Sequence, residues 1–452
     1  MTSSVRNRGT RQPIGSLNVM ADSPEASFCF VHAADLHLDT PFRDVHDLPH
    51  HVAEALREAS LQAFDSIVEL ALERRAAFVV IAGDIYDGLE RGLRAQVRFH
   101  KGLALLAGEG IPSFVVHGNH DPVSTGWSAI SSWPRGVTIF GGESVGLVPV
   151  EKDGAVIATV QGISYATRMT TENLSLRFRR PDGPGVHVGL LHCNLEGSVD
   201  HDAYSPCSLD DLRSARLDYW ALGHIHLRRV IEGSGPGNPW IVYPGNSQAR
   251  SPKPSEQSAK GAIVVHVRQG VVDDAEFVPC DRVRFEEIES TIEGVPDLPS
   301  LVENLGEQGA ARLAAAEGRS AILRARLTGR GVLHALLARP GATDDLVRAL
   351  REETGDRQPF CWWDEIEDLT KGIVDLDAIR RRGDFAADLV ELAENVGSNP
   401  AAAAELAGRV VAGAPRAFAG ALDGIAGDDE TLARLFDEAT STALDAVAGD
   451  EP

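Results

Sequence analysis

Seven side chains of types that bind metals occur in a fixed order along the first half of this 452-residue chain. Each ends or follows a short apolar run, so each stands where a buried strand is expected to give way to a loop. They are Asp35, His37, Asp84, Asn119, His192, His224 and His226. Because residues just past the carboxyl ends of neighbouring strands meet in one cleft, this order predicts a shared site.

The mixture of side chains indicates the chemistry. Aspartate and histidine together suit a borderline or hard divalent ion such as Mn²⁺, Fe²⁺ or Zn²⁺. If Asp84 bridges, the seven residues can serve two ions, with four protein ligands each. Two ions about 4 Å apart clamp a phosphate and activate a water for in-line attack. Asn119 is a neutral oxygen ligand, so it moderates the negative charge that faces an anionic phosphate.

Elements that could position these residues alternate along the first part of the chain. Apolar runs and helical spacing predict a strand at 28–34, a helix at 50–75, a strand at 76–83, a helix at 94–110 and a strand at 111–118. This rhythm predicts a parallel sheet with crossover helices.

The next part of the chain is rich in strands that Gly and Pro separate. They are expected at 136–140, 155–162, 185–192, 217–223, 239–245, 261–267 and 273–280. The last two strands predict a closing hairpin.

The ordered motifs D-x-H, G-D, G-N-H-D, H and G-H-x-H resemble those of the calcineurin-like metallophosphoesterases, over about residues 28–280. The sequence segments between these motifs, such as GDIYDG, GLLHCNLEG and VYPGNSQAR, are similar to those of the SbcD-like DNA repair exonucleases. Within that family they are most similar to the bacterial YhaO-type group. The resemblance implies a four-layer α/β/β/α sandwich. It also implies a small α/β cap domain after the sandwich.

The resemblance also implies how the site residues divide their work. One metal would be held by Asp35, His37, Asp84 and His226, and the other by Asp84, Asn119, His192 and His224. His120 would be the general acid that protonates the leaving ribose oxygen. Mn²⁺ is the expected ion, with Fe²⁺, Zn²⁺ and Mg²⁺ as alternatives.

The residue three positions after the bridging aspartate departs from part of this group. Some of these nucleases carry histidine there, whereas this chain has Asp87, as bacterial SbcD-type sequences do. The role of Asp87 is left open. Candidate substrate contacts are Asp87, Arg228, Asn246 and Arg250.

The net charge of −23 is unusual for a protein that binds nucleic acid. Residues 287–452 hold 16 Lys and Arg against 32 Asp and Glu, and residues 1–286 hold 27 against 34. Two bound divalent ions would offset part of the acidic excess in the first region. Arginines in LRFRR, after G-H-x-H and after YPGN are hypothesised to contact a nucleic-acid backbone, and solvated loop charge explains them equally well.

The chain divides into four expected regions. Residues 1–27 are expected to be a disordered tail, 28–280 the metallophosphoesterase domain, 281–370 the small α/β cap domain and 371–452 an acidic, Ala-rich helical region. The chain has no G-x-x-x-x-G-K-[ST] motif, so any use of ATP must come from a partner. By resemblance that partner would be an SMC-like coiled-coil ATPase, and a homodimer is a second expectation.

The cysteines and the hydropathy of the chain indicate where in the cell the protein is expected. The five cysteines are scattered without C-x-x-C spacing, which predicts a reducing bacterial cytoplasm. No apolar run approaches 18 residues, so no membrane span is expected.

These observations favour a two-metal DNA exonuclease or endonuclease in DNA repair or end processing. An alternative is a calcineurin-like phosphatase or cyclic-nucleotide phosphodiesterase for a small substrate, which the acidic balance favours and the long extension disfavours. A DNA-end-binding scaffold is a third reading, against which the full set of ligands and His120 argues.

Overall fold

The computed structural model describes residues 27–397 apart from 41, 46–47, 89–91, 125–127, 197–203, 355–357, 374–375, and a few isolated positions beyond 397. The chain forms two compact units. The first comprises residues 1–328 with 336–369, and the second 329–335 with 370–452.

The first unit contains a six-stranded sheet in the order β14-β13-β1-β2-β3-β4. Its strands are β1 Phe28–Ala33, β2 Val79–Ala82, β3 Ser113–Val116, β4 Val137–Ile139, β13 Gly261–Arg268 and β14 Val271–Pro279. Strands β1 to β4 are parallel, and β13 and β14 form the predicted hairpin. Parallel neighbours need crossover connections, which contain α1 (His50–Glu73) and α2 (Leu93–Gly108).

A second six-stranded sheet has the order β11-β12-β10-β7-β6-β5. Its strands are β5 Gly146–Lys152, β6 Ala155–Gly162, β7 Val186–His192, β10 Tyr219–Gly223, β11 Arg229–Ile231 and β12 Trp240–Tyr243. Strand β5 is not predicted from the sequence. This strand lies at the edge of the sheet, is mostly solvent-accessible and contains Pro149, so it lacks the apolar run that marks a buried strand.

The two sheets pack face to face between layers of helix. Phe30 of β1 meets Tyr219 of β10 in the space between them, with ring centroids 5.3 Å apart. Phe64 and Phe99, from α1 and α2, pack on the outer face of the first sheet. Trp220 on the outer face of the second sheet donates to a backbone carbonyl of α3 (Leu209–Ser214). The order of layers is α/β/β/α, so the predicted fold class is confirmed.

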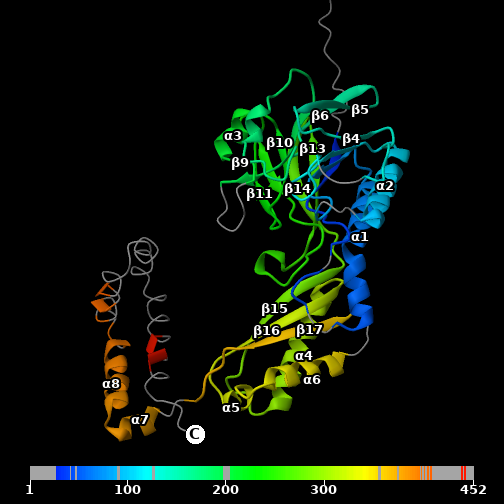
Figure 1. Ribbon diagram of the computed structural model, residues 1–452. Helices are drawn as coiled ribbons and strands as arrows, with labels where there is room; N and C mark the ends of the chain where they lie inside the picture. The colour runs from blue at the N-terminus through cyan, green and yellow to red at the C-terminus, as the bar shows by residue number, and fades with distance from the viewer. Residues whose placement is uncertain are drawn as a thin grey trace, which may run out of the picture. The chain divides into compact units, whose positions relative to one another are not determined.

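A three-stranded parallel sheet lies in the same unit. It consists of β15 Val283–Thr291, β16 Ser320–Thr328 and β17 Cys361–Asp368, with α4 Leu298–Ala315 and α6 Ala342–Thr354 packed on it. The first half of α1 packs against this sheet as well, through Val52 and Leu56 beside Phe285 and Ile322. One helix of 24 residues therefore contacts both the sandwich and the smaller sheet (Figure 1). The domain boundary at residue 280 stays a prediction.

The remaining elements are short or belong to the second unit. They are η1 Leu174–Arg177, β8 Asn194–Leu195, β9 Pro206–Cys207, η2 Pro254–Glu256, α5 His334–Leu337, α7 Leu376–Arg382 and α8 Phe385–Gly397. Helices α7 and α8 pack through Ile379, Ala386 and Val390. The predicted N-terminal tail lies outside the described residues, and so does most of the part of the predicted helical region 371–452 that follows residue 397. Among the described helices, none is long and apolar enough to cross a membrane.

Candidate metal centre

The residues predicted to bind metal come together at the carboxyl ends of five strands. Strands β1, β2 and β3 are parallel neighbours in one sheet, and β7 and β10 are parallel neighbours in the other. Asp35 and His37 follow β1, Asp84 follows β2, Asn119 follows β3, His192 ends β7, and His224 and His226 follow β10. The sandwich therefore delivers all seven side chains to one edge, as the rule for strand ends requires.

Asp84 lies at the middle of this cluster. Its Oδ2 atom is 3.4 Å from Nε2 of His192 and 3.9 Å from Nε2 of His37. The Oδ1 atom of Asn119 is 3.0 Å from Nε2 of His192. Asp84, His192 and Asn119 form one group of ligand atoms. A second group contains His37, whose Nε2 lies 3.2 Å from Nε2 of His226. Asp84 is thus placed to bridge two neighbouring sets of ligand atoms.

The remaining two ligands complete the same cluster. The imidazoles of His192 and His224 have ring centroids 5.2 Å apart. Asp35 Oδ1 lies 3.9 Å from Nδ1 of His192 and accepts the backbone N–H of His224 over 3.0 Å. Asp35, His37 and His226 have donor atoms within 4.8 Å of one another, and so do Asp35, Asp84 and His192. The residues therefore fit two cations.

The buried carboxylates of the cluster favour a bound cation. Burial would lower the pKa of His192, but the negative charge of Asp84 and their hydrogen bond raise it to about 10. Burial raises the pKa of Asp35 to about 6. Burial, reinforced by the charge of Arg250, keeps the pKa of His37 well below its usual range, so this imidazole is neutral and able to bind a metal. Metal ions at this position would supply the positive charge that a proton on His192 otherwise provides.

Hydrogen bonds fix which ring nitrogens face the cluster. The carbonyl of Ala82 can only accept, so Nδ1 of His192 donates to it over 2.9 Å and leaves Nε2 for a metal. Nδ1 of His226 lies 2.6 Å from a carboxylate oxygen of Glu256, which leaves its Nε2 free in the same way. Nδ1 of His37 is buried without a hydrogen-bond partner in the described residues. Glu256 could not be identified from the sequence, because it ends the short 3₁₀ helix η2, which no motif marks.

The backbone is unusual at the same positions. Asp35, His37, Asp84 and His224 have positive φ angles, between 42° and 101°, which side chains other than glycine rarely adopt. Such strain persists where the surrounding structure holds it, and it clusters at functional sites. Here the backbone N–H of His120 donates to Asp84 Oδ1 over 3.0 Å. The loops are therefore held in the conformation that presents the ligands.

Gly118 shows why glycine opens the G-N-H-D motif. A Cβ atom there would clash with Asp84 Oδ1 and would lie 2.8 Å from two atoms of the His192 ring. The bare backbone at this position lets the loop after β3 approach two ligands from different sheets. Any larger residue would displace the carboxylate in the middle of the cluster.

Asp87 lies between His120 and two arginines. Its Oδ1 atom lies 2.5 Å from Nδ1 of His120, and its Oδ2 atom accepts from Arg250 over 3.2 Å and lies 3.5 Å from Arg43. Burial would lower the pKa of His120, but the hydrogen bond to Asp87 and the nearby carboxylate charges raise it overall. His37, Asp87 and His120 also have donor atoms within 4.8 Å. The two arginines already compensate Asp87, which favours an orienting role for it over metal ligation.

The other predicted substrate contacts have different surroundings. Asn246 is fully buried, and its amide donates to Glu256 over 2.7 Å and to the carbonyl of Gln248 over 2.9 Å. We therefore assign it to the support of His226. Arg228 is exposed, with its guanidinium 4.6 Å above the ring of Phe277. Contact of Arg228 and Arg250 with substrate stays a prediction.

Comparisons with known proteins agree with this architecture. Residues 29–228 match the family described as calcineurin-like phosphoesterase, and residues 285–371 match the middle domain of metallophosphoesterase YhaO. The chain is 34% identical over 351 residues to the uncharacterized metallophosphoesterase YhaO of Bacillus subtilis, which covers 77% of this chain and 83% of that protein.

More distant relatives are DNA double-strand break repair proteins named Mre11. The one from Thermoplasma acidophilum is 26% identical over 54% of this chain, and the one from Archaeoglobus fulgidus is 27% identical over 58%. The matches span 64% and 59% of those two proteins. A dimetal phosphatase from Danio rerio is a structural match, with 14% identity, a TM-score of 0.33, and coverage of 56% of this chain and 97% of that one. On the extent of the YhaO match, the chain belongs to the calcineurin-like metallophosphoesterases, in the group that carries a YhaO-type middle domain.

Proposed function

We propose that this chain is a DNA nuclease that hydrolyses phosphodiester bonds with two divalent metal ions, Mn²⁺ by expectation, in DNA repair or end processing. The observation that carries the proposal is the cluster of seven ligands with His120 beside it, half-buried and hydrogen-bonded to Asp87. The similarity to DNA double-strand break repair proteins supports DNA as the substrate.

The chain's residues have distinct tasks in this mechanism. We infer that one ion is held by Asp35, His37, Asp84 and His226, and the other by Asp84, Asn119, His192 and His224. Bound ions would supply Lewis-acid stabilisation of the phosphoryl oxygens and lower the pKa of a bound water. Hydrolysis would replace the P–O bond to the leaving oxygen with a bond to the oxygen of water, and the leaving oxygen would then need a proton.

His120 then handles the proton. Asp87 holds Nδ1, so Nε2 is the nitrogen free to protonate the leaving oxygen. The raised pKa keeps His120 protonated at a higher pH than an ordinary histidine would allow. Arg250 donates to the other oxygen of Asp87 and, together with Arg43, places positive charge beside this pair.

Ion pairs of several arginines with carboxylates of the same chain favour a small phosphodiester as the second candidate substrate. Several arginines that could contact a nucleic-acid backbone are paired within the chain: Arg177 with Glu172, Arg180 with Asp218, and Arg229 with Glu196. Paired cations release fewer counterions on DNA binding, so they contribute less to affinity for DNA. A metallophosphodiesterase for a small substrate would use the same metal centre.

The deciding experiment incubates the purified full chain and Mn²⁺ with end-labelled linear DNA. The same preparation is assayed in parallel on bis(p-nitrophenyl) phosphate. We expect cleavage of DNA that stops when a chelator is added and returns with Mn²⁺. Hydrolysis of the small diester without any cleavage of DNA would contradict the nuclease proposal and favour the second candidate.

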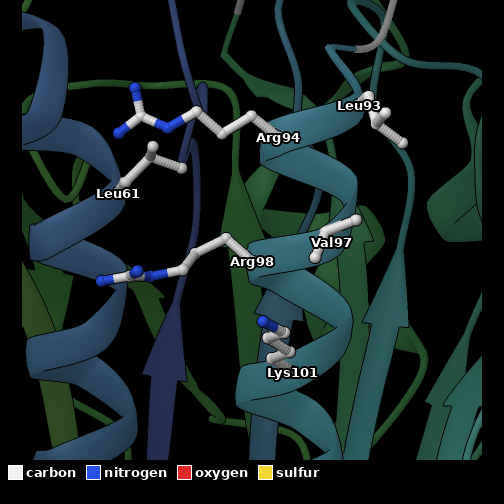
Figure 2. Close-up of a pocket in the computed structure, with 6 residues that line it drawn as sticks. All are labelled: Leu61, Leu93, Arg94, Val97, Arg98 and Lys101. Carbon is white, nitrogen blue, oxygen red and sulfur yellow. The ribbon is translucent and has the colours of Figure 1, made fainter.

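We also propose partners for the chain: DNA, an SMC-like coiled-coil ATPase that would supply any use of ATP, and a second copy. A candidate place for the second copy is a groove of about 470 Å³ (Figure 2). It lies along α1 and α2 and is lined by Leu61, Leu93, Arg94, Val97, Arg98 and Lys101. Leu93 and Val97 are 57% and 37% exposed, and a dimer would cover them.

Val97→Asp is expected to convert a dimer into a monomer, because it places a charge in the apolar part of this groove. The measurement is the molar mass in solution by light scattering. Val271→Asp is the matched control, since Val271 is 50% exposed at the start of β14, outside the groove. A dimer that persists in Val97→Asp, or a monomeric wild type, would contradict this interface.

A further inference from the structure

Three hydrogen-bond donors converge on the carboxylate of Glu256. Nδ1 of His226 lies 2.6 Å from Oε1, and Nδ2 of Asn246 lies 2.7 Å from Oε2. The backbone N–H of Arg250 donates to the same Oε2 over 3.1 Å. Glu256 is only 5% exposed, so these groups, rather than water, satisfy its oxygens.

Because all three partners donate hydrogen bonds, the side chain at position 256 has to accept with both of its terminal atoms, as a carboxylate does and an amide does not. The amide of Asn246 and the backbone of Arg250 present N–H groups, which can only donate. His226 must keep Nε2 without a proton in order to bind a metal, so Nδ1 carries the proton and also donates. Glutamine at position 256 would turn its own NH₂ group toward at least one of these donors.

The loop of residues 246–256 makes two further connections. Arg250 donates to Asp87, the partner of the general acid. Gln248 donates to the carbonyl of Val283 over 2.6 Å and accepts the N–H of that residue over 3.3 Å, at the start of β15. This segment therefore joins a metal ligand, the proposed general acid and the first strand of the three-stranded sheet.

We propose that Glu256 is a positioning residue of the metal centre. It holds His226 in the tautomer and orientation that bind a metal, and it closes the loop that brings Arg250 to Asp87. The inference rests on the proposed two-metal hydrolase, but it does not depend on DNA as the substrate. Removing the carboxylate partner of a metal-bound imidazole typically weakens metal binding about 10–100-fold.

The test is calorimetric titration of the metal-free full chain with Mn²⁺. Glu256→Gln is expected to weaken binding at one of two sites about 10–100-fold and to leave the other unchanged. The midpoint of thermal unfolding of the metal-free protein should fall only modestly, by the cost of one buried donor that loses its partner. Glu276→Gln is the matched control. Glu276 also accepts from a histidine, His266, but it lies on β14 and is not part of the ligand cluster.

A double-mutant cycle then separates positioning from a general structural role. If Glu256 acts through His226, Glu256→Gln should weaken Mn²⁺ binding no further when added to His226→Ala. Additive losses in the cycle would overturn the proposal, and so would unchanged Mn²⁺ affinity in Glu256→Gln. Equal weakening at both sites with a large fall in the unfolding midpoint would also overturn it. A wild type that binds Mn²⁺ but does not cleave DNA would contradict the nuclease and leave this inference standing.

Discussion

Asp84→Ala is expected to abolish binding of both metal ions and, with it, hydrolysis. The Asp84 carboxylate lies between the ligand group that contains His37 and the group that contains His192, so its loss affects both. A metal centre contributes several kcal/mol of transition-state stabilisation, which corresponds to a fall in rate of about 10³-fold or more. The measurements are metal content per chain and the rate of phosphodiester hydrolysis at saturating Mn²⁺.

The control for this prediction is Asp182→Ala, which removes an exposed aspartate from a loop outside the site. It should keep both ions and full activity. An Asp84→Ala protein that is folded and retains two ions would show that the bridging role is wrong. Retained ions with lost activity would place Asp84 in the chemistry rather than in metal binding.

The candidate site could be predicted from the sequence because strand ends leave a strong local signal. A buried strand reads as a short apolar run, and a polar residue directly after it has few structural uses. The structure brings all seven predicted ligands into one cluster, although the first and last belong to strands of different sheets. The grouping of these residues follows from topology alone, whereas the identity of the ions and of the substrate does not.

Residues that act through a neighbour left no such signal. Glu256 ends the short helix η2 in a segment rich in Ser and Pro, and its relation to His226 exists only after the chain folds. The role of Asp87 was open for the same reason, because its partner His120 follows a different strand. Asn246 is among the substrate contacts predicted from the sequence, but it is fully buried and donates to Glu256, the partner of His226.

The fold was predictable to a similar degree. The helices expected at 50–75 and 94–110 occur as α1 and α2, since their apolar residues recur at helical spacing. The exposed edge strand β5 was missed because only one of its seven residues is buried. The packing of α1 on the three-stranded sheet was also beyond sequence reasoning, since Val52 and Leu56 show that one face is apolar but not what covers it.

The family accounts for hydrolysis and for two divalent ions, so the remaining question about mechanism is how the proton reaches the leaving oxygen. His120→Ala is expected to retain both ions while kcat falls about 10²–10⁴-fold, the usual contribution of a general acid. The imidazole follows a metal ligand along the chain, but its Nδ1 atom is bound to Asp87, so its removal should leave the ligand cluster intact. The measurements are metal content and single-turnover rates on DNA and on a small diester.

Asp87→Asn gives this prediction its pH signature. Asp87 raises the pKa of His120, and a general acid must be protonated, so activity is lost as pH rises through that pKa. Without the carboxylate the pKa falls, and the loss of activity should move to lower pH. His120→Ala should remove this limb of the profile altogether. Unchanged kcat in His120→Ala, or an Asp87→Asn profile that moves to higher pH, would mean that another group protonates the leaving oxygen.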